Sequence, residues 1–265
     1  MTSFVDRLLQ AGLAEKEGNE IIHLTMLGQA VGGSSLSFES GLRLVELLRN
    51  IDVATTPPLH ILALVQVLPE MSDVYTPLMT RGRAEAARAN DVITRYGNAI
   101  CRLLQRYGAD EHEFWRRCKR AAILFDWVEG VSVENLERSY TANPYAGAIR
   151  FGDIVSIADA TRFHLRSAHR ILAALFPDQP AFLEAVDVLL TRLEFGIPER
   201  ALPLRKLPVP LTRGQSLALL REGVHTPEAV SSMSDSQLVA CVGGAVFERL
   251  RPQAITDAPP DVANG

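Results

Sequence analysis

One aromatic side chain, Phe163, lies among arginines in a segment whose spacing suits nucleic-acid chemistry. The segment 153–176 is predicted to be one long helix, with a continuous apolar stripe at about 100° per residue. Phe163 falls opposite the stripe, with Arg162 and Arg166 on the flank and Arg170 beside it. An exposed ring can stack on a base while guanidinium groups hold phosphates. The residues therefore suggest a single-strand contact centred on Phe163.

The same pattern has a structural interpretation, which the sequence leaves open. Phe163 could pack against a second layer of helices, and arginines at this spacing are often only the solvated side of a helix. Ser156 and Ser167 are expected on that polar side. The expected core stripe consists of Ile154, Ile157, Ala158, Thr161, Leu165, Ala168, Leu172 and Leu175.

Catalytic patterns are not found in the sequence. It has no GxxxxGK[ST] phosphate loop, so no ATP site of that kind can be built from it. The run Asp110-Glu111-His112-Glu113 has the composition of a helicase acidic box in the wrong order, and it suits the first turn of a helix. No histidines or cysteines have metal-ligand spacing. We predict no catalytic residue, no metal and no cofactor.

The densest basic run consists of Arg116, Arg117, Lys119 and Arg120. We interpret it first as the solvated side of a helix that carries Phe114, and second as a phosphate-facing surface.

Composition limits the class of protein. The 265 residues are 47% hydrophobic with a net charge of -4, and the pI is about 5.9. This balance argues against a protein that coats duplex DNA through its overall field. No apolar run reaches the ~20 residues of a membrane span, and no secretory signal is evident. Three separated cysteines suggest reduced thiols, so we expect a cytoplasmic protein without a membrane partner.

The first 33 residues are typical of the end of a winged-helix domain. A short helix stopped by Gly12 precedes a hairpin signal, KEGNEIIHLT, with Gly18-Asn19 as its turn. The helices that normally precede such a wing are missing. The pattern therefore favours a fragment or the product of a split gene.

The remaining pattern is helical. Thr56 before Pro57 is expected to cap an apolar, central helix, and Ser132 and Asp153 to cap two later ones. Glycines 108, 130 and 196 are expected to end others. Two short helix pairs follow, and residues 253–265 are expected to be a disordered tail.

The order of these elements resembles superkiller-type DNA helicases of superfamily two, which include archaeal fork-repair helicases and the helicase half of polymerase theta. The resemblance covers roughly residues 5–250. It is carried by AAILFDWVEGVSVENLERSY, FGDIVSIADATRFHLRSAHRILAAL and LLTRLEFGIPERALPLRKLPVPLTRGQSLALLREGVHTPEAV. It implies the part that follows two RecA-like motor domains: the end of a winged helix (1–33), a helical ratchet bundle (34–195) and a helix-hairpin-helix domain (196–252).

The resemblance also implies roles for individual residues. The family's ratchet helix begins with Gly-Asp, here Gly152-Asp153, and stacks a tryptophan on the strand where this chain has Phe163. The family's arginine two turns earlier is Ser156 here, so half of that contact is absent. In the hairpins, glycines normally approach a phosphate. The first hairpin instead offers Thr212 and Arg213, whereas the second keeps Gly243 and Gly244, with Arg249 after them.

The expected fold is mainly α: a helical bundle with an N-terminal wing and a C-terminal helix-hairpin-helix domain. The leading hypothesis is a single-stranded or forked DNA-binding module of an ATP-dependent DNA helicase that acts in DNA repair or processing. Its motor domains would lie on another chain or have been lost with a truncated gene. The alternative is a protein-interaction scaffold that has lost DNA binding. A winged-helix transcription regulator is disfavoured, because the groove-reading unit would lack its scaffold.

Overall fold

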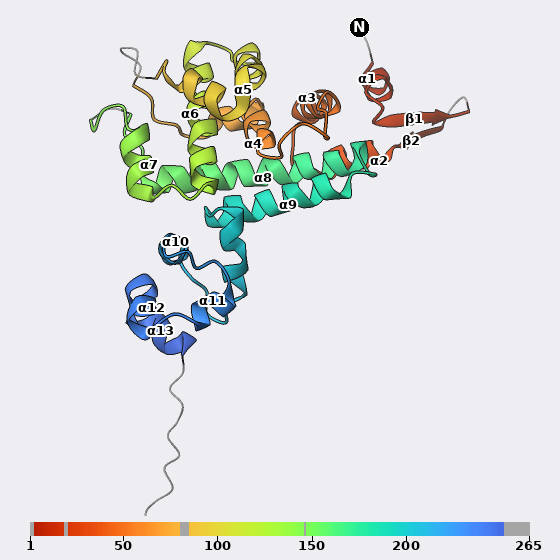
Figure 1. The fold of residues 1–265 in the computed structure, drawn as a ribbon. Coiled ribbons are helices and arrows are strands. Elements are labelled where there is room, and N and C mark those ends of the chain that lie inside the picture. The colour runs from red at the N-terminus through yellow and green to blue at the C-terminus, as the bar shows by residue number, and fades with distance from the viewer. Residues whose placement is uncertain (1–2, 19–20, 80–84, 146, 252–265) are drawn as a thin grey trace, which may run out of the picture. The chain divides into compact units, whose positions relative to one another are not determined.

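The computed structural model describes residues 3–18, 21–79, 85–145 and 147–251, and these are mainly helical (Figure 1). They fall into two compact units, divided between Glu199 and Arg200. The expectation of a mainly α fold with a small N-terminal hairpin is confirmed.

The N-terminal elements form a helix followed by a two-stranded hairpin. Helix α1 (Phe4–Gln10) precedes strands β1 (Ala14–Glu17) and β2 (Ile21–Leu24), which pair antiparallel. The predicted turn lies partly outside the described residues. Leu13 and two residues of α2 (Met26–Gly32) belong to the main core of the first unit. Residues up to 33 therefore share one core with the bundle.

The bundle of the first unit is built from helices that follow the predicted pattern. Gly130 and Gly196 have positive φ where two of them end, and the side chains of Asp110 and Ser132 cap the starts of two of them. The elements are α3 (Phe38–Arg49), α4 (His60–Val65), the 3-10 helix η1 (Pro69–Asp73), α5 (Arg88–Arg106), α6 (Glu111–Val128), α7 (Val133–Tyr140), α8 (Phe151–Leu175) and α9 (Pro180–Phe195).

Two predicted helix starts are wrong. Thr56 does not cap α4, which begins at His60 without a side-chain cap, because Pro58 disfavours helical backbone at Pro57. Asp153 lies in the first turn of α8, where its carboxylate accepts a hydrogen bond from the Arg150 N–H at 2.8 Å. The helix therefore begins two residues before the predicted cap.

Helix α8 is the central element of the first unit. It packs against α2, α3, α4, α6 and α9, and α9 runs beside it in Figure 1. The predicted core stripe is buried from Ile154 to Leu172, and Leu175 is partly buried. Ser167, predicted on the polar side, is buried instead, because helices cover more of α8 than a single stripe. The neighbours on several sides fix how α8 is rotated.

The second unit has its own small core. Helix η2 (Glu199–Lys206) leads into α10 (Arg213–Arg221), α11 (Pro227–Ser231), α12 (Asp235–Val242) and α13 (Gly244–Leu250). These give the two short helix pairs expected from the sequence. The core residues are Leu204, Leu211, Leu219, Val230, Leu238 and Val242. The predicted tail lies outside the described residues.

The basic run on α6 is buried, so our interpretation of it as a solvated face is wrong. Lys119 and Arg120 are fully buried, Arg117 is nearly so, and Arg116 is partly exposed. Burial is tolerated because carboxylates lie within reach. Glu85 meets Lys119 at 2.8 Å, and Glu113 meets both Arg117 and Arg120 at 3.1 Å.

This buried network extends to α8. The Arg120 Nε donates to Gln66 at 3.0 Å, and the Gln66 amide donates to Thr161 at 3.1 Å. Burial lowers the pKa of Arg120 to about 10 against the opposing pull of Glu113, so its guanidinium remains charged at neutral pH. The network thus joins α6, α4 and α8 through charged and polar groups.

We expect Glu113→Gln to destabilise the first unit by about 3–5 kcal/mol, because it leaves two buried guanidinium groups without their carboxylate. Glu111→Gln, an exposed acid in the same helical turn, should cost less than about 1 kcal/mol. Unfolding in guanidinium chloride, followed by the fluorescence of the two buried tryptophans, measures the free energy of unfolding of both variants. Equal losses would show that the network contributes nothing beyond the helix dipole.

Candidate nucleic-acid interface

Phe163 lies on the outer side of α8. Its side chain is 48% exposed, whereas Thr161, two residues earlier, and Leu165, two residues later, are fully buried. Two residues are about 200° of helix, which places Phe163 opposite the core. The alternative that Phe163 is buried in a second layer therefore does not hold within this chain.

His164 follows Phe163 and contacts its ring edge-on, with 5.2 Å between the ring centroids. The imidazole is buried, and its Nδ1 has no hydrogen-bond partner within the described segments. Burial lowers its pKa below the usual histidine value, so the ring is neutral at physiological pH. His164 thus contacts the Phe163 ring edge-on and is uncharged there.

The three arginines predicted around Phe163 have different environments. Arg162 forms ion pairs with two acids, Glu194 at 2.6 Å and Asp159 at 3.6 Å. Arg170 donates a 2.8 Å hydrogen bond to the Gly33 carbonyl, which ties α8 to the end of α2. Arg166 is exposed and forms no ion pair or hydrogen bond with any residue that the structure describes.

Phe163 and Arg166 are therefore the pair whose side chains remain available to a ligand. They are three residues apart, so they lie on the same side of the helix. Ser156 is exposed two turns before Phe163 and offers a hydroxyl there instead of a cation. The sequence alone could not separate Arg166 from its two neighbours, because their acceptors come from α9 and from the end of α2.

The first predicted hairpin of the second unit uses its polar groups locally. The Thr212 hydroxyl accepts from the Gln215 N–H at 3.3 Å, and Gln215 accepts from the Thr212 N–H at 2.9 Å. These bonds cap α10. Arg213 is only partly exposed. Burial lowers its pKa to about 10, so the guanidinium is still charged at neutral pH.

The second predicted hairpin is open to solvent. Gly243 has φ +80° and joins α12 to α13, and a Cβ at Gly243 or Gly244 would meet nothing within 4 Å. Arg249 is exposed. Arg251, by contrast, is held by Asp235 and the Met233 carbonyl. The glycines thus leave backbone accessible, and Arg249 is the exposed cation of α13.

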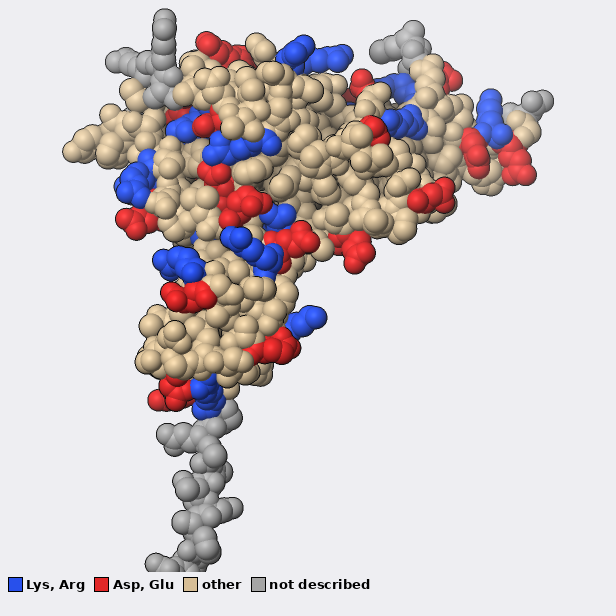
Figure 2. Space-filling view, viewed as in Figure 1, with Lys and Arg blue, Asp and Glu red and all other residues tan. Residues whose placement is uncertain are grey.

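The surface charge is mixed. Figure 2 shows lysine and arginine side chains interspersed with aspartate and glutamate on the face that it displays, rather than gathered in one basic field. Around Phe163, two acids, Asp159 and Glu194, accompany Arg162 and Arg166. Any nucleic-acid contact here is local and involves few phosphates.

Within the described ranges, no helix is long and apolar enough to cross a membrane. No group of three or more histidine, cysteine or acidic side chains among the same residues could hold a metal ion.

Comparison with known proteins gives a distant similarity to DNA helicases, whereas no family model matches the chain. The chain is 25% identical over 187 residues to the ATP-dependent DNA helicase Hel308 of Pyrococcus abyssi, covering 70% of this chain and 24% of that protein. It is also 25% identical over 143 residues to the helicase of the same name from Pyrococcus horikoshii, covering 53% of this chain and 19% of that protein. The chain thus spans about a quarter or less of these relatives, and its sequence is helicase-related.

Proposed function

We propose that this chain is a single-stranded DNA-binding module of an ATP-dependent DNA helicase that acts in DNA repair or processing. The observation that carries the proposal is the pairing of exposed Phe163 with unpaired Arg166 on α8. The similarity to helicases over 70% of the chain supports the same conclusion.

In this proposal a base stacks on the Phe163 ring and Arg166 holds the adjoining phosphate. A stacked base contributes about 1–3 kcal/mol and does not depend on sequence, because every base has a π face. Arg162 and Arg170 mainly hold α8 in place, because Arg162 pairs with α9 and Arg170 bonds to the end of α2. The strand thus meets a helix whose rotation is already fixed.

The proposed domain layout follows the resemblance. Residues 1–33 are the end of a winged helix, 34–195 a ratchet-like bundle, and 196–252 a helix-hairpin-helix domain. In the last, Gly243, Gly244 and Arg249 would hold the backbone of the strand, with Thr212 and Arg213 in a lesser role. ATP hydrolysis would come from RecA-like motor domains on another chain.

One further candidate function has structural support. A protein-interaction scaffold without DNA binding is favoured by the internal bonds of Arg162 and Arg170 and by the acids beside Phe163. Absence of any binding to single-stranded DNA at micromolar concentrations of the chain would favour this function.

We expect Phe163→Ala to weaken binding of a labelled single strand by about 5- to 150-fold, the equivalent of one lost stacking contact. Fluorescence anisotropy at fixed salt measures this change. Phe151→Ala is the matched control, because Phe151 lies on the same helix and is 50% exposed. The control should bind like the unmodified chain, and equal weakening in both variants would contradict a specific role for Phe163.

A second prediction concerns salt. Each phosphate neutralised on a single strand contributes about 0.7 to the slope of log K against log salt. We expect Arg166→Ala to make that slope shallower by about 0.7, because one phosphate contact is lost. Arg170→Ala, one helical turn later, should leave the slope unchanged. A slope that does not respond to Arg166→Ala would rule out this phosphate contact.

A further inference from the structure

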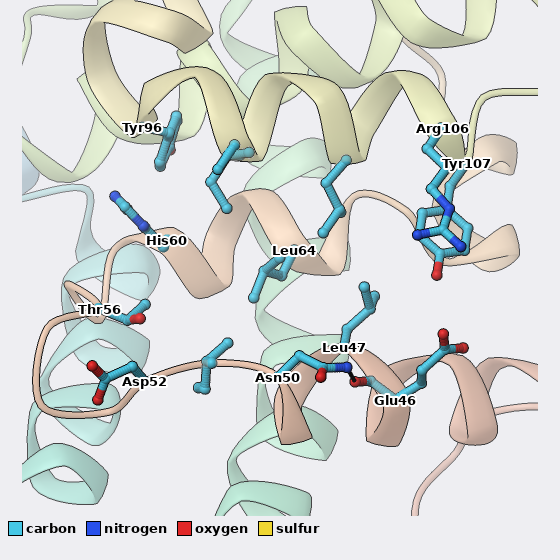
Figure 3. Close-up of a pocket in the computed structure, with 14 residues that line it drawn as sticks. Glu46, Leu47, Asn50, Asp52, Thr56, His60, Leu64, Tyr96, Arg106 and Tyr107 are labelled. Atoms are coloured by element: carbon cyan, nitrogen blue, oxygen red, sulfur yellow. Dashed lines mark hydrogen bonds between the residues drawn. The ribbon is translucent and has the colours of Figure 1, made fainter.

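A groove of about 540 Å³ lies between α3 and α5 in the first unit, with α4 along its floor (Figure 3). Residues of α3 and the segment after it form one wall, and residues of α5 from Tyr96 to Tyr107 form the other. The sequence patterns did not indicate this groove, since three separate helices create it.

The groove follows from how its helices are built. Helix α4 has only six residues, and Ile61 to Val65 are all buried, so α4 lies low between its neighbours. Helix α5 is interrupted at Gly97, where φ is +85° and ψ is 166°. A Cβ at Gly97 would meet nothing within 4 Å. The glycine is therefore needed there for its backbone conformation and not for space.

Aliphatic side chains form part of the floor and inner walls of the groove. Leu47, Leu64 and Ile100 are buried at its base, and Ile51 and Leu103 are partly exposed above them. Tyr96 is nearly fully buried, and its hydroxyl donates to the Ala121 carbonyl at 2.9 Å. The surface offered to a ligand is therefore divided nearly evenly between apolar and polar groups.

The rim carries more negative than positive charge. Glu46 and Asp52 are exposed carboxylates, and neither forms an ion pair within the part of the chain that the structure describes. The Asp52 carboxylate accepts hydrogen bonds from the neighbouring Ala54 N–H and Thr55 hydroxyl. On the opposite wall, Arg106 lies over the Tyr107 ring, 5.6 Å from its centroid. Two carboxylates against one guanidinium favour a basic occupant and oppose a nucleic-acid backbone.

The length of the groove indicates the kind of occupant. On this wall the uninterrupted helix after Gly97 runs from Asn98 to Arg106, which is eight residue steps or about 12 Å. A partly aliphatic groove of this length between two helices can receive about two turns of the apolar stripe of a third helix, whose side chains recur at i, i+4 and i+7.

We propose that the groove between α3 and α5 binds an amphipathic helix of a partner protein. Aliphatic side chains of that helix fill the space above Leu64, and its lysines or arginines lie beside Glu46 and Asp52. This surface is separate from Phe163, which lies on the outer side of α8. The proposal does not depend on DNA binding.

The test uses two synthetic helical peptides of about 14 residues, or about 21 Å, with leucines at i, i+4 and i+7. One has lysines on both flanks of the stripe, and the other has glutamates there. Each is fluorescently labelled and titrated with the full chain. We expect the lysine peptide to bind about three- to tenfold more tightly than the glutamate peptide, because rim charges contribute modestly.

Three variants locate the binding. Ala99→Trp fills the groove from an exposed position and should abolish binding of the lysine peptide without disturbing the core. Glu46→Lys should weaken it about two- to fivefold. Glu184→Lys makes the same charge change at an exposed position on α9 and should have no effect.

The proposal is overturned if neither peptide binds at millimolar concentration, since the groove would then accept only small solutes. It is also overturned if Ala99→Trp binds the lysine peptide as well as the unmodified chain does. Equal weakening by Glu46→Lys and Glu184→Lys would show general charge attraction in place of docking in the groove. Loss of DNA binding in Phe163→Ala has no bearing on any of these results.

Discussion

A buried chain of polar contacts from Glu113 through Arg120 and Gln66 to Thr161 constrains the first unit. It links α6, α4 and α8 with bonds of 3.0–3.1 Å. A buried guanidinium without acceptors is costly, so these partners cannot slide or rotate independently. Thr161 is thereby fixed toward the interior. Phe163, about 200° further around the same helix, is directed outward by the same constraint.

The side chains of α8 that are available to a ligand are those that form no contacts with the rest of the bundle. Arg162 and Arg170 bond to α9 and to the end of α2, and Ser167 is buried by neighbouring helices. These contacts hold the helix in place, but they leave fewer hydrogen-bond donors of the protein available to a ligand. Phe163 is exposed and Arg166 has no partner among the described residues. This pair suits the proposed single-strand contact, which would involve little charge and accept any base.

Patterns confined to one helix were predictable from the sequence. The apolar stripe of α8, the acidic first turn of α6, the cap at Ser132 and the glycine ends at Gly130 and Gly196 follow local rules, and each is present. The helix starts at Thr56 and Asp153 were local errors, whereas the errors about burial arose where distant segments meet. Arg117, Lys119 and Arg120 looked solvated because the segments that cover them, including the one that carries Glu85, come close only in the fold. Glu113, by contrast, lies four residues before Arg117 on the same helix. The α3–α5 groove depends on three helices at once and has no signature in any of them.

The most direct test of a single-strand contact at Phe163 is photo-cross-linking. A single strand carrying 5-iodouracil is irradiated with the full chain, and the cross-linked peptides are identified by mass spectrometry. We expect the main cross-link in the peptide that contains Phe163 and Arg166, because a stacked base lies against that ring. Cross-links found only outside residues 151–175 would contradict that placement and show that the strand, if bound, uses another surface.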